Sequence, residues 1–237
     1  MPTKISRGYR VVAFILRPIT TMMTRKDWHG AQNLPSERGF IAVANHVSYA
    51  DPVTFAHFLY NNGHPPRFLA KSSLFELPIA GSILRNLDQI PVYRNSKRAR
   101  DAIDRGEAVL TRGDMIAVFP EGTLTKDPEM WPMVARTGAA RMALEANVPV
   151  IPVAQWGAHR LLSPYSKLLK PFPRKKITVI AGPPVDLDEF RDRPLDTETL
   201  RAATNKIMAT LTSMLEEIRG EQAPAKPFDL RDKGREA

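Results

Sequence analysis

The sequence predicts a single α/β domain, and three observations support this fold class. From residue 39 onward, short apolar runs alternate with segments of helical periodicity, a pattern typical of strands joined by helices. The run Phe40–Ala44 is apolar at every position, as in a strand that is covered on both faces. The chain of 237 residues shows neither an internal repeat nor a linker, so one domain accounts for its length.

The expected elements follow this alternation in chain order. The expected strands are Phe40–Ala44, Arg67–Ala70, Gln89–Tyr93, Met115–Phe119, Val150–Gln155 and Lys176–Ala181. The expected helices are Pro52–Tyr60, Pro78–Leu87, Lys97–Thr111 with Ser96 as its N-cap, and Thr137–Ala146. A last helix is expected between Asp196 as N-cap and Gly220 as stop, because apolar residues recur there mostly at intervals of three and four. Its apolar stripe predicts core packing.

The N-terminal segment, residues 1–27, is expected to be helical and to associate with a membrane surface. Its apolar stretch from Val11 to Met23 is interrupted by Arg17 and Pro18, which predicts a short kinked helix or a helix pair rather than a spanning helix. Basic residues surround this stretch, and no acidic residue precedes Asp27. The pattern favours a helix in the headgroup layer of anionic lipid. A surface helix that caps the domain core is the alternative.

Residues 28–220 are expected to form the main domain. Within it, Leu161–Pro173 is rich in Pro, Leu and Lys and is expected to be an irregular loop, with the membrane as its candidate partner. Residues 221–237 are polar, aperiodic and contain proline, so we expect a flexible tail.

Composition excludes several classes of protein. With 43% hydrophobic and 25% charged residues, the chain is neither disordered throughout nor collagen-like. The absence of cysteine excludes disulfides, thiolate zinc sites and a cysteine nucleophile. The net charge of +9 favours an anionic partner, such as acidic lipid, a phosphorylated metabolite or nucleic acid.

The segment ANHVSYADP carries the strongest candidate for catalysis. His46 leaves the first expected strand and Asp51 opens the next helix, so the turn can fold the carboxylate back onto the imidazole. Neutral histidine is a natural base for an alcohol proton, and a carboxylate on its other ring nitrogen fixes the tautomer. A His-x4-Asp pair arises by chance in roughly one such chain in four. Ser48 lacks a G-x-S-x-G elbow and is interpreted as a turn residue.

Three further segments carry candidate binding residues. Glu121, Gly122 and Thr123 form a tight polar turn after the fourth expected strand, where successive N–H groups suit a phosphate. Lys71 follows the second expected strand and Arg94 the third, and such cations suit phosphate recognition. Taken singly, an ordinary turn and two solvated surface cations are the alternatives.

Placement connects these candidates with His46. Each follows the end of a different expected strand, and the carboxyl ends of strands in an open parallel sheet share the edge where ligands bind. In order and spacing, the segments NHVSYAD, AKSSLFELPIAG, QIPVYR, FPEGT and VPVIPV resemble the glycerolipid acyltransferases, more narrowly the bacterial 1-acylglycerol-3-phosphate acyltransferases. The resemblance covers about residues 38–156.

The resemblance implies a fold and an activity. The fold is a mixed, mainly parallel sheet flanked by helices, with an N-terminal membrane-associating helical segment. The activity belongs to phospholipid biosynthesis: a fatty acyl group moves from acyl-CoA or acyl carrier protein to a hydroxyl of 1-acylglycerol-3-phosphate, giving phosphatidate. The implied location is peripheral or monotopic, on the cytoplasmic face of the cell membrane. Neither a metal nor a cofactor is expected besides the acyl donor.

The resemblance also implies residue roles. His46 becomes the general base of an HX4D motif and Asp51 its orienting partner. The acceptor site is implied to comprise Lys71, Arg94, Glu121, Gly122 and Thr123.

One position departs from the family pattern. Leu124 stands where members commonly carry arginine directly after FPEGT. Lys126 is the candidate replacement, and a different acceptor, glycerol-3-phosphate or another lysophospholipid, is the alternative.

Other function classes remain as competing hypotheses. A thioesterase or lipid hydrolase could use the same His/Asp pair, and a lipid-binding relative could lack activity. A nucleic-acid binder is disfavoured because no basic stripe interleaves with stacking aromatics.

Overall fold

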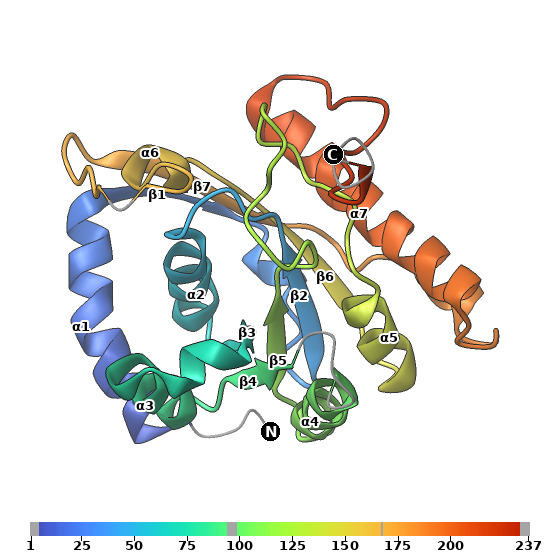
Figure 1. The fold of residues 1–237 in the computed structure, drawn as a ribbon. Helices are drawn as coiled ribbons and strands as arrows, with labels where there is room; N and C mark the ends of the chain where they lie inside the picture. Colours follow the sequence, from blue (N-terminus) through green and yellow to red (C-terminus); the bar gives the residue numbers. More distant parts are fainter. Residues whose placement is uncertain (1–4, 94–98, 167, 233–237) are drawn as a thin grey trace.

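The computed structural model describes residues 5–93, 99–166 and 168–232, and its centre is a sheet with helices on both faces (Figure 1). The strand order among these residues is β1-β7-β6-β2-β5-β3-β4. The strands are β1 (Thr24–His29), β2 (Phe40–Ala44), β3 (Arg67–Lys71), β4 (Ile90–Val92), β5 (Met115–Val118), β6 (Val150–Trp156) and β7 (Lys175–Ala181). Neighbouring strands are parallel except β6 and β7, so the expected mixed, mainly parallel sheet is confirmed.

Different helices cover the two faces of the sheet. They are α1 (Arg7–Met23), α2 (Asp51–Asn61), α3 (Pro78–Asn86), α4 (Ala99–Thr111), α5 (Gly138–Glu145), α6 (Ala158–Leu161) and α7 (Thr197–Arg219). Short 3₁₀ turns occupy Ala31–Asn33, Ser72–Glu76 and Asp188–Phe190. Ile41 and Val43 of β2 share a buried cluster with residues of α4, α5 and α7. The intervening Phe40, Ala42 and Ala44 belong to the cluster under α2, so β2 is covered on both sides as its sequence predicts.

The N-terminal segment differs from its expected form. α1 is one helix with Pro18 inside it rather than a helix pair. The hydroxyl of Thr20 donates to the carbonyl of Leu16 at 2.9 Å, within the turn that contains the proline. α1 packs on α2 and α3, outside the layer formed by α2 (Figure 1). Among the described residues, no helix combines the length and hydropathy that crossing a membrane requires.

β1 was not expected from the sequence. Its residues TRKDWH are mostly polar because it lies at the edge of the sheet, where a charged strand resists pairing with other chains. It crosses the boundary expected at residue 27 and joins the N-terminal segment to the sheet through β7. The chain leaves β1 through Gly30 at a positive φ of 76°, where a Cβ would collide with the carbonyl of Ala181.

The last helix has the expected ends, and the segment after it folds back. Asp196 caps α7 by accepting from the N–H of Thr199 at 2.8 Å, and Gly220 ends it in the left-handed conformation. Residues 221–232, expected to be a flexible tail, return to the domain instead. The carbonyl of Phe228 accepts a hydrogen bond from the N–H of Val134 at 2.9 Å. This bond joins the C-terminal segment to the loop between β5 and α5.

Candidate functional site

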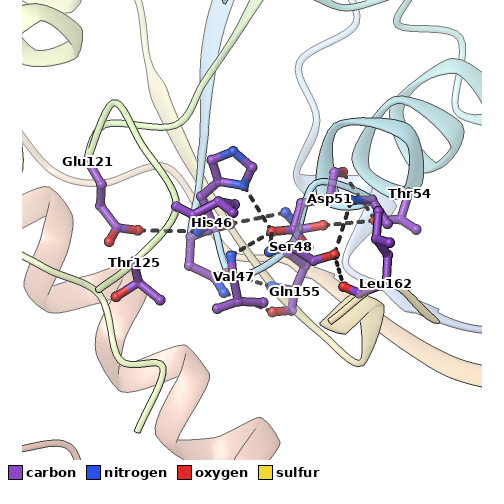
Figure 2. Close-up of polar contacts among 12 residues, drawn as sticks. His46, Val47, Ser48, Asp51, Thr54, Glu121, Thr125, Gln155 and Leu162 are labelled. Atoms are coloured by element: carbon purple, nitrogen blue, oxygen red, sulfur yellow. Dashed lines mark hydrogen bonds and ion pairs between the residues drawn. The ribbon is translucent and has the colours of Figure 1, made fainter. Parts of the chain in front are cut away.

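The turn between β2 and α2 brings His46 and Asp51 together. Asp51 is fully buried, and its Oδ2 lies 3.0 Å from Nδ1 of His46. The same oxygen accepts hydrogen bonds from the N–H groups of Val47 at 2.6 Å and Ser48 at 2.7 Å (Figure 2). The predicted contact between imidazole and carboxylate therefore exists, and the turn's own backbone holds the carboxylate in place.

The contact with Asp51 selects one tautomer of the neutral His46 ring. A carboxylate facing Nδ1 accepts a hydrogen bond from Nδ1–H, so Nε2 carries the lone pair on the opposite side of the imidazole. The His46 side chain is 13% exposed, and its ring stacks on Phe119 with centroids 4.1 Å apart. The carboxylate and the aromatic face together fix the orientation of the ring, with Nε2 on the side away from Asp51.

Burial and hydrogen bonding act on Asp51 in opposite directions. Removal from water raises the pKa of Asp51 above its usual range. The hydrogen bond from His46 and those from two backbone N–H groups stabilise the carboxylate and lower the pKa. A carboxylate in such surroundings stabilises an imidazolium that forms beside it, because the new positive charge compensates the buried negative one.

Ser48 has the role of a turn residue. Its Oγ donates to the carbonyl of Leu162 at 2.6 Å and accepts from the N–H of Ala50 at 3.0 Å. The hydroxyl therefore ties the turn to the chain that follows α6, and the interpretation of Ser48 as a turn residue is confirmed.

A buried amide pair beside His46 escaped the sequence analysis. Asn45 and Gln155 exchange three hydrogen bonds of 2.9 to 3.1 Å between their side chains and backbones, which links β2 to β6. The side-chain Oε1 of Gln155 also accepts from the Thr54 hydroxyl at 3.2 Å, which adds α2 to the network. The available signal was a lone polar residue in the apolar strand VIPVAQW, but its partner is 110 residues away in sequence.

Glu121 connects two loops rather than presenting its carboxylate to solvent. It is 4% exposed; Oε1 accepts from the N–H of His46 at 3.2 Å and Oε2 from the N–H of Met133 at 2.9 Å. Burial raises the pKa of Glu121 to about 8, although both N–H groups act against this shift. In this geometry both oxygens accept hydrogen bonds from backbone donors, so Glu121 joins the two loops, and its acceptor-binding role stays a prediction.

A small cavity beside the catalytic-type pair gathers cationic side chains. It has a volume of about 130 Å³, and its lining includes Lys71, Gly122 and Arg136 together with Phe119, the residue that stacks on His46. Gly122 turns the chain at a positive φ of 73°, which brings backbone rather than a side chain to the cavity wall. Lys71 and Gly122 are two of the residues expected at the site, whereas Arg136 was not expected because it lies in a loop without a distinctive spacing.

The structure describes only some of the other expected site residues. Arg94 falls outside the described residues. Thr123 is half-buried next to Gly122, and Leu124 is 3% exposed. Lys126 is exposed and is absent from the lining of the 130 Å³ cavity, whereas Arg136 contributes to that lining.

Comparisons with known proteins find acyltransferases. The family model described as Acyltransferase matches residues 25–156. A 1-acyl-sn-glycerol-3-phosphate acyltransferase of Bacillus subtilis is 25% identical over 199 residues, which cover 84% of this chain and 92% of that protein. A lyso-ornithine lipid O-acyltransferase of Pseudomonas aeruginosa is 34% identical over 112 residues, 47% of this chain and 41% of that one.

Longer relatives and a solved structure complete the comparison. The chloroplastic 1-acyl-sn-glycerol-3-phosphate acyltransferase BAT2 of Brassica napus is 29% identical over 58% of this chain, which spans 39% of that protein's length. The crystal structure of the 1-acyl-sn-glycerophosphate acyltransferase PlsC of Thermotoga maritima shares the fold, with a TM-score of 0.63 and 23% identity over 91% of this chain and 84% of that one. Because the family model spans more than half of the sequence, including both members of the His/Asp pair, the chain belongs to the Acyltransferase family.

Proposed function

We propose that this protein transfers a fatty acyl group from acyl-CoA or acyl carrier protein to a hydroxyl of 1-acylglycerol-3-phosphate, giving phosphatidate. The observation that carries the proposal is the contact of 3.0 Å between His46 and the buried Asp51, beside a cavity lined by Lys71 and Arg136. A base and a pair of cations are what an acceptor with one alcohol and one phosphate requires. The names of the Bacillus and Brassica relatives support the same acceptor.

The chemistry follows from the orientation of the imidazole. Nε2 of His46 removes the proton of the acceptor hydroxyl while that oxygen attacks the thioester carbonyl. The tetrahedral intermediate collapses, the carbon–sulfur bond breaks, and the thiolate takes the proton back from the imidazolium. Asp51 stabilises the imidazolium between these two steps. A covalent acyl-enzyme is unnecessary, and the hydroxyl of Ser48 is engaged with the carbonyl of Leu162.

The cationic cavity suits the acceptor phosphate. Lys71 and Arg136 come from β3 and from the loop before α5, and both line the cavity with Gly122. Charge-assisted hydrogen bonds to a phosphate are about twice as strong as neutral ones, so this cavity favours a phosphomonoester over a zwitterionic head group. Glu121 contributes by holding the loop that carries Gly122 against the backbone of His46.

An apolar cavity suits the acyl chain. It has a volume of about 240 Å³ between α1 and α2, and Val53, Ala56 and Phe68 contribute to its lining. Phe68 stacks on Phe119, which in turn stacks on His46, so this apolar region approaches the reacting centre. Each methylene removed from water there contributes about 0.8 kcal/mol.

The membrane supplies the lysophospholipid acceptor, and the exposed side chains fit a peripheral position on its surface. Phe14 of α1 is 81% exposed and Ile79 of α3 is 78% exposed. Large apolar side chains exposed on adjacent helices are costly in water and are satisfied in the interfacial region of a bilayer.

The base assignment is tested by replacing the pair. His46→Ala should lower acyl transfer by about 10²- to 10⁴-fold, and Asp51→Asn should also lower it strongly because the neutral amide favours the wrong tautomer. His29→Ala is a matched control, since His29 also contacts an aspartate, Asp27, at 3.0 Å but its side chain is 61% exposed. Transfer that survives in His46→Ala would refute the assignment.

An acceptor panel tests the substrate. Labelled acyl-CoA is incubated with lysophosphatidate, glycerol-3-phosphate, a lyso-ornithine lipid, or without an acceptor, and products are identified by mass. Lysophosphatidate should react fastest, and Arg136→Gln should raise its KM more than it lowers kcat, because the guanidinium binds a group that does not react. If free fatty acid is released without an acceptor as fast as the acyl group is transferred to lysophosphatidate, the protein is a thioesterase instead.

A further inference from the structure

A second hollow lies along α1 and shares no lining residue with the cationic cavity of the proposed acceptor site. It adjoins the apolar cavity between α1 and α2, because Ala13 and Arg17 line both. Its volume is about 740 Å³, and it lies between α1, β1 and the chain just before β7. Phe14 and Met22 of α1 and Phe172 give it apolar walls, and these three side chains are 81%, 57% and 63% exposed. Its lining also contains three cations, Arg17, Lys26 and Arg174. The hollow therefore combines an apolar surface with a concentrated positive charge.

Arg174 forms one wall of the hollow and fixes it to α1. Its guanidinium donates to the carbonyl of Thr21 at 2.8 Å and to that of Thr24 at 2.6 Å. These carbonyls belong to the C-terminal end of α1, where unpaired carbonyls carry a partial negative charge. By covering them, Arg174 removes the repulsion that an anion would otherwise meet at this end of the helix. The wall is formed before any ligand arrives.

Arg17 and Lys26 are held in place without an acidic partner. The guanidinium of Arg17 lies 5.7 Å from the centre of the Tyr60 ring, and the ammonium of Lys26 lies 4.7 Å from the centre of the Trp28 ring. In the part of the chain that the structure describes, neither cation forms an ion pair with a carboxylate. Partial burial and the nearby Arg17 both lower the pKa of Lys26. Two neighbouring cations that repel each other gain most from an anion placed between them.

We propose that this hollow binds one anionic phospholipid, with its phosphate between Arg17 and Lys26 and its acyl chains along Phe14, Met22 and Phe172. The combination of charge and apolar wall matches an amphiphile and not a free anion, because inorganic phosphate would leave the apolar wall in water. The bound lipid is a membrane component and not a substrate, since the lining of the hollow contains neither His46 nor any residue of the cationic cavity. The proposal rests on the proposed function only in placing the protein at a bilayer.

The test separates a defined site from general attraction to a charged surface. Binding of a short-chain phosphatidylglycerol, held below its micelle-forming concentration, is followed by calorimetry. The full-length protein should bind one molecule saturably. Arg17→Gln combined with Lys26→Gln should weaken binding by about ten-fold or more, because each lost contact is a charge-assisted hydrogen bond.

The control removes the same charge from α1 outside the hollow. Arg7→Gln combined with Arg10→Gln also lowers the net charge by two, and these positions are exposed and do not line the hollow. This variant should bind the monomeric lipid within about two-fold of the original protein, since exposed charges at a distance are screened. Circular dichroism of both variants checks that α1 is intact.

Three results would overturn the proposal. Equal losses in the two double variants would show that only net charge matters. Equal affinity for short-chain phosphatidylcholine would show that the two cations do not select an anion. Equal affinity for inorganic phosphate would show that the apolar walls do not contribute to binding. Acyl transfer by the unmodified protein to lysophosphatidate in detergent micelles is measured separately. Absence of acyl transfer in that assay would refute the proposed function, but the comparison of lipid binding between the two double variants would remain valid.

Discussion

Burial and charge conflict at Glu121, and this conflict gives a prediction about stability. Burial raises its pKa to about 8 from an ordinary value of 4.5. Between these values the unfolded chain loses a proton that the folded chain keeps. The free energy of unfolding should therefore fall as pH rises through this window, by at most about 1.4 kcal/mol per pH unit from this group.

Glu121→Gln removes the titrating group and should flatten that part of the profile. Urea denaturation at several pH values between about 5 and 8 measures the free energy of unfolding of the original protein and of the variant. The glutamine keeps one accepting oxygen, but its amide N–H₂ would face a backbone N–H of His46 or Met133. We therefore expect the variant to be less stable near the lower end of the window. Parallel profiles for the two proteins would contradict the raised pKa.

The residues of the site that could be predicted from the sequence are those joined by local geometry. His46 and Asp51 are five residues apart, and a single strand-to-helix turn brings them together. Arg136 reaches its cavity through a long loop, and Gln155 reaches Asn45 across the sheet. Contacts of this kind depend on the whole fold and leave no periodic signal in one sequence.

At the scale of elements, the end of α7 is joined to the loop that holds Glu121. The guanidinium of Arg219 lies between two indole rings, 3.7 Å from the centre of Trp131 and 4.5 Å from that of Trp156. It also donates to the carbonyl of Glu129 at 2.9 Å, and its side chain is 7% exposed. Trp131 belongs to the same loop as Met133, the donor to Glu121. The C-terminal helix thereby supports the site from outside the region matched by the family model.

Replacement of Arg219 tests this support. Arg219→Ala should lower the free energy of unfolding by about 2 kcal/mol or more, because a desolvated cation–π contact and a hydrogen bond are lost. Arg219→Lys should recover only part of this, since an ammonium cannot stack between two planes. Arg105→Ala on the exposed side of α4 is the control and should change stability by less than about 0.5 kcal/mol. Equal stability of the lysine variant and the original protein would contradict the stacking account.

The elements that sequence patterns predicted are those with a buried face. β2 and α7 bury regular apolar positions, so their periodicity identifies them. β1 was missed because an edge strand with polar residues has no such pattern, and its pairing with β7 joins segments about 150 residues apart. The return of residues 221–232 was missed for a similar reason, because its contact with Val134 is a backbone hydrogen bond.

The whole molecule presents α1, α3 and the chain between β6 and β7 along the same side (Figure 1). The two interpretations of the N-terminal segment are both compatible with α1. Ala13 and Met23 are buried, so one face of the helix covers the domain, while Phe14 on another face is 81% exposed. An N-terminal helix can thus complete the core and still offer an apolar surface to a bilayer.

This arrangement predicts how membrane binding depends on salt and on single side chains. With a net charge of +9, binding to vesicles that contain phosphatidylglycerol should weaken as salt screens the charges, but a salt-resistant part should remain. Phe14→Ser should reduce that remaining part, because burying a phenylalanine contributes about 1.5 to 3 kcal/mol. Leu230→Ser is the control, since Leu230 is 38% exposed but lies in the C-terminal segment. Co-sedimentation at low and high salt measures both. Equal binding of Phe14→Ser and Leu230→Ser at high salt would mean that α1 only covers the domain and does not enter the headgroup layer.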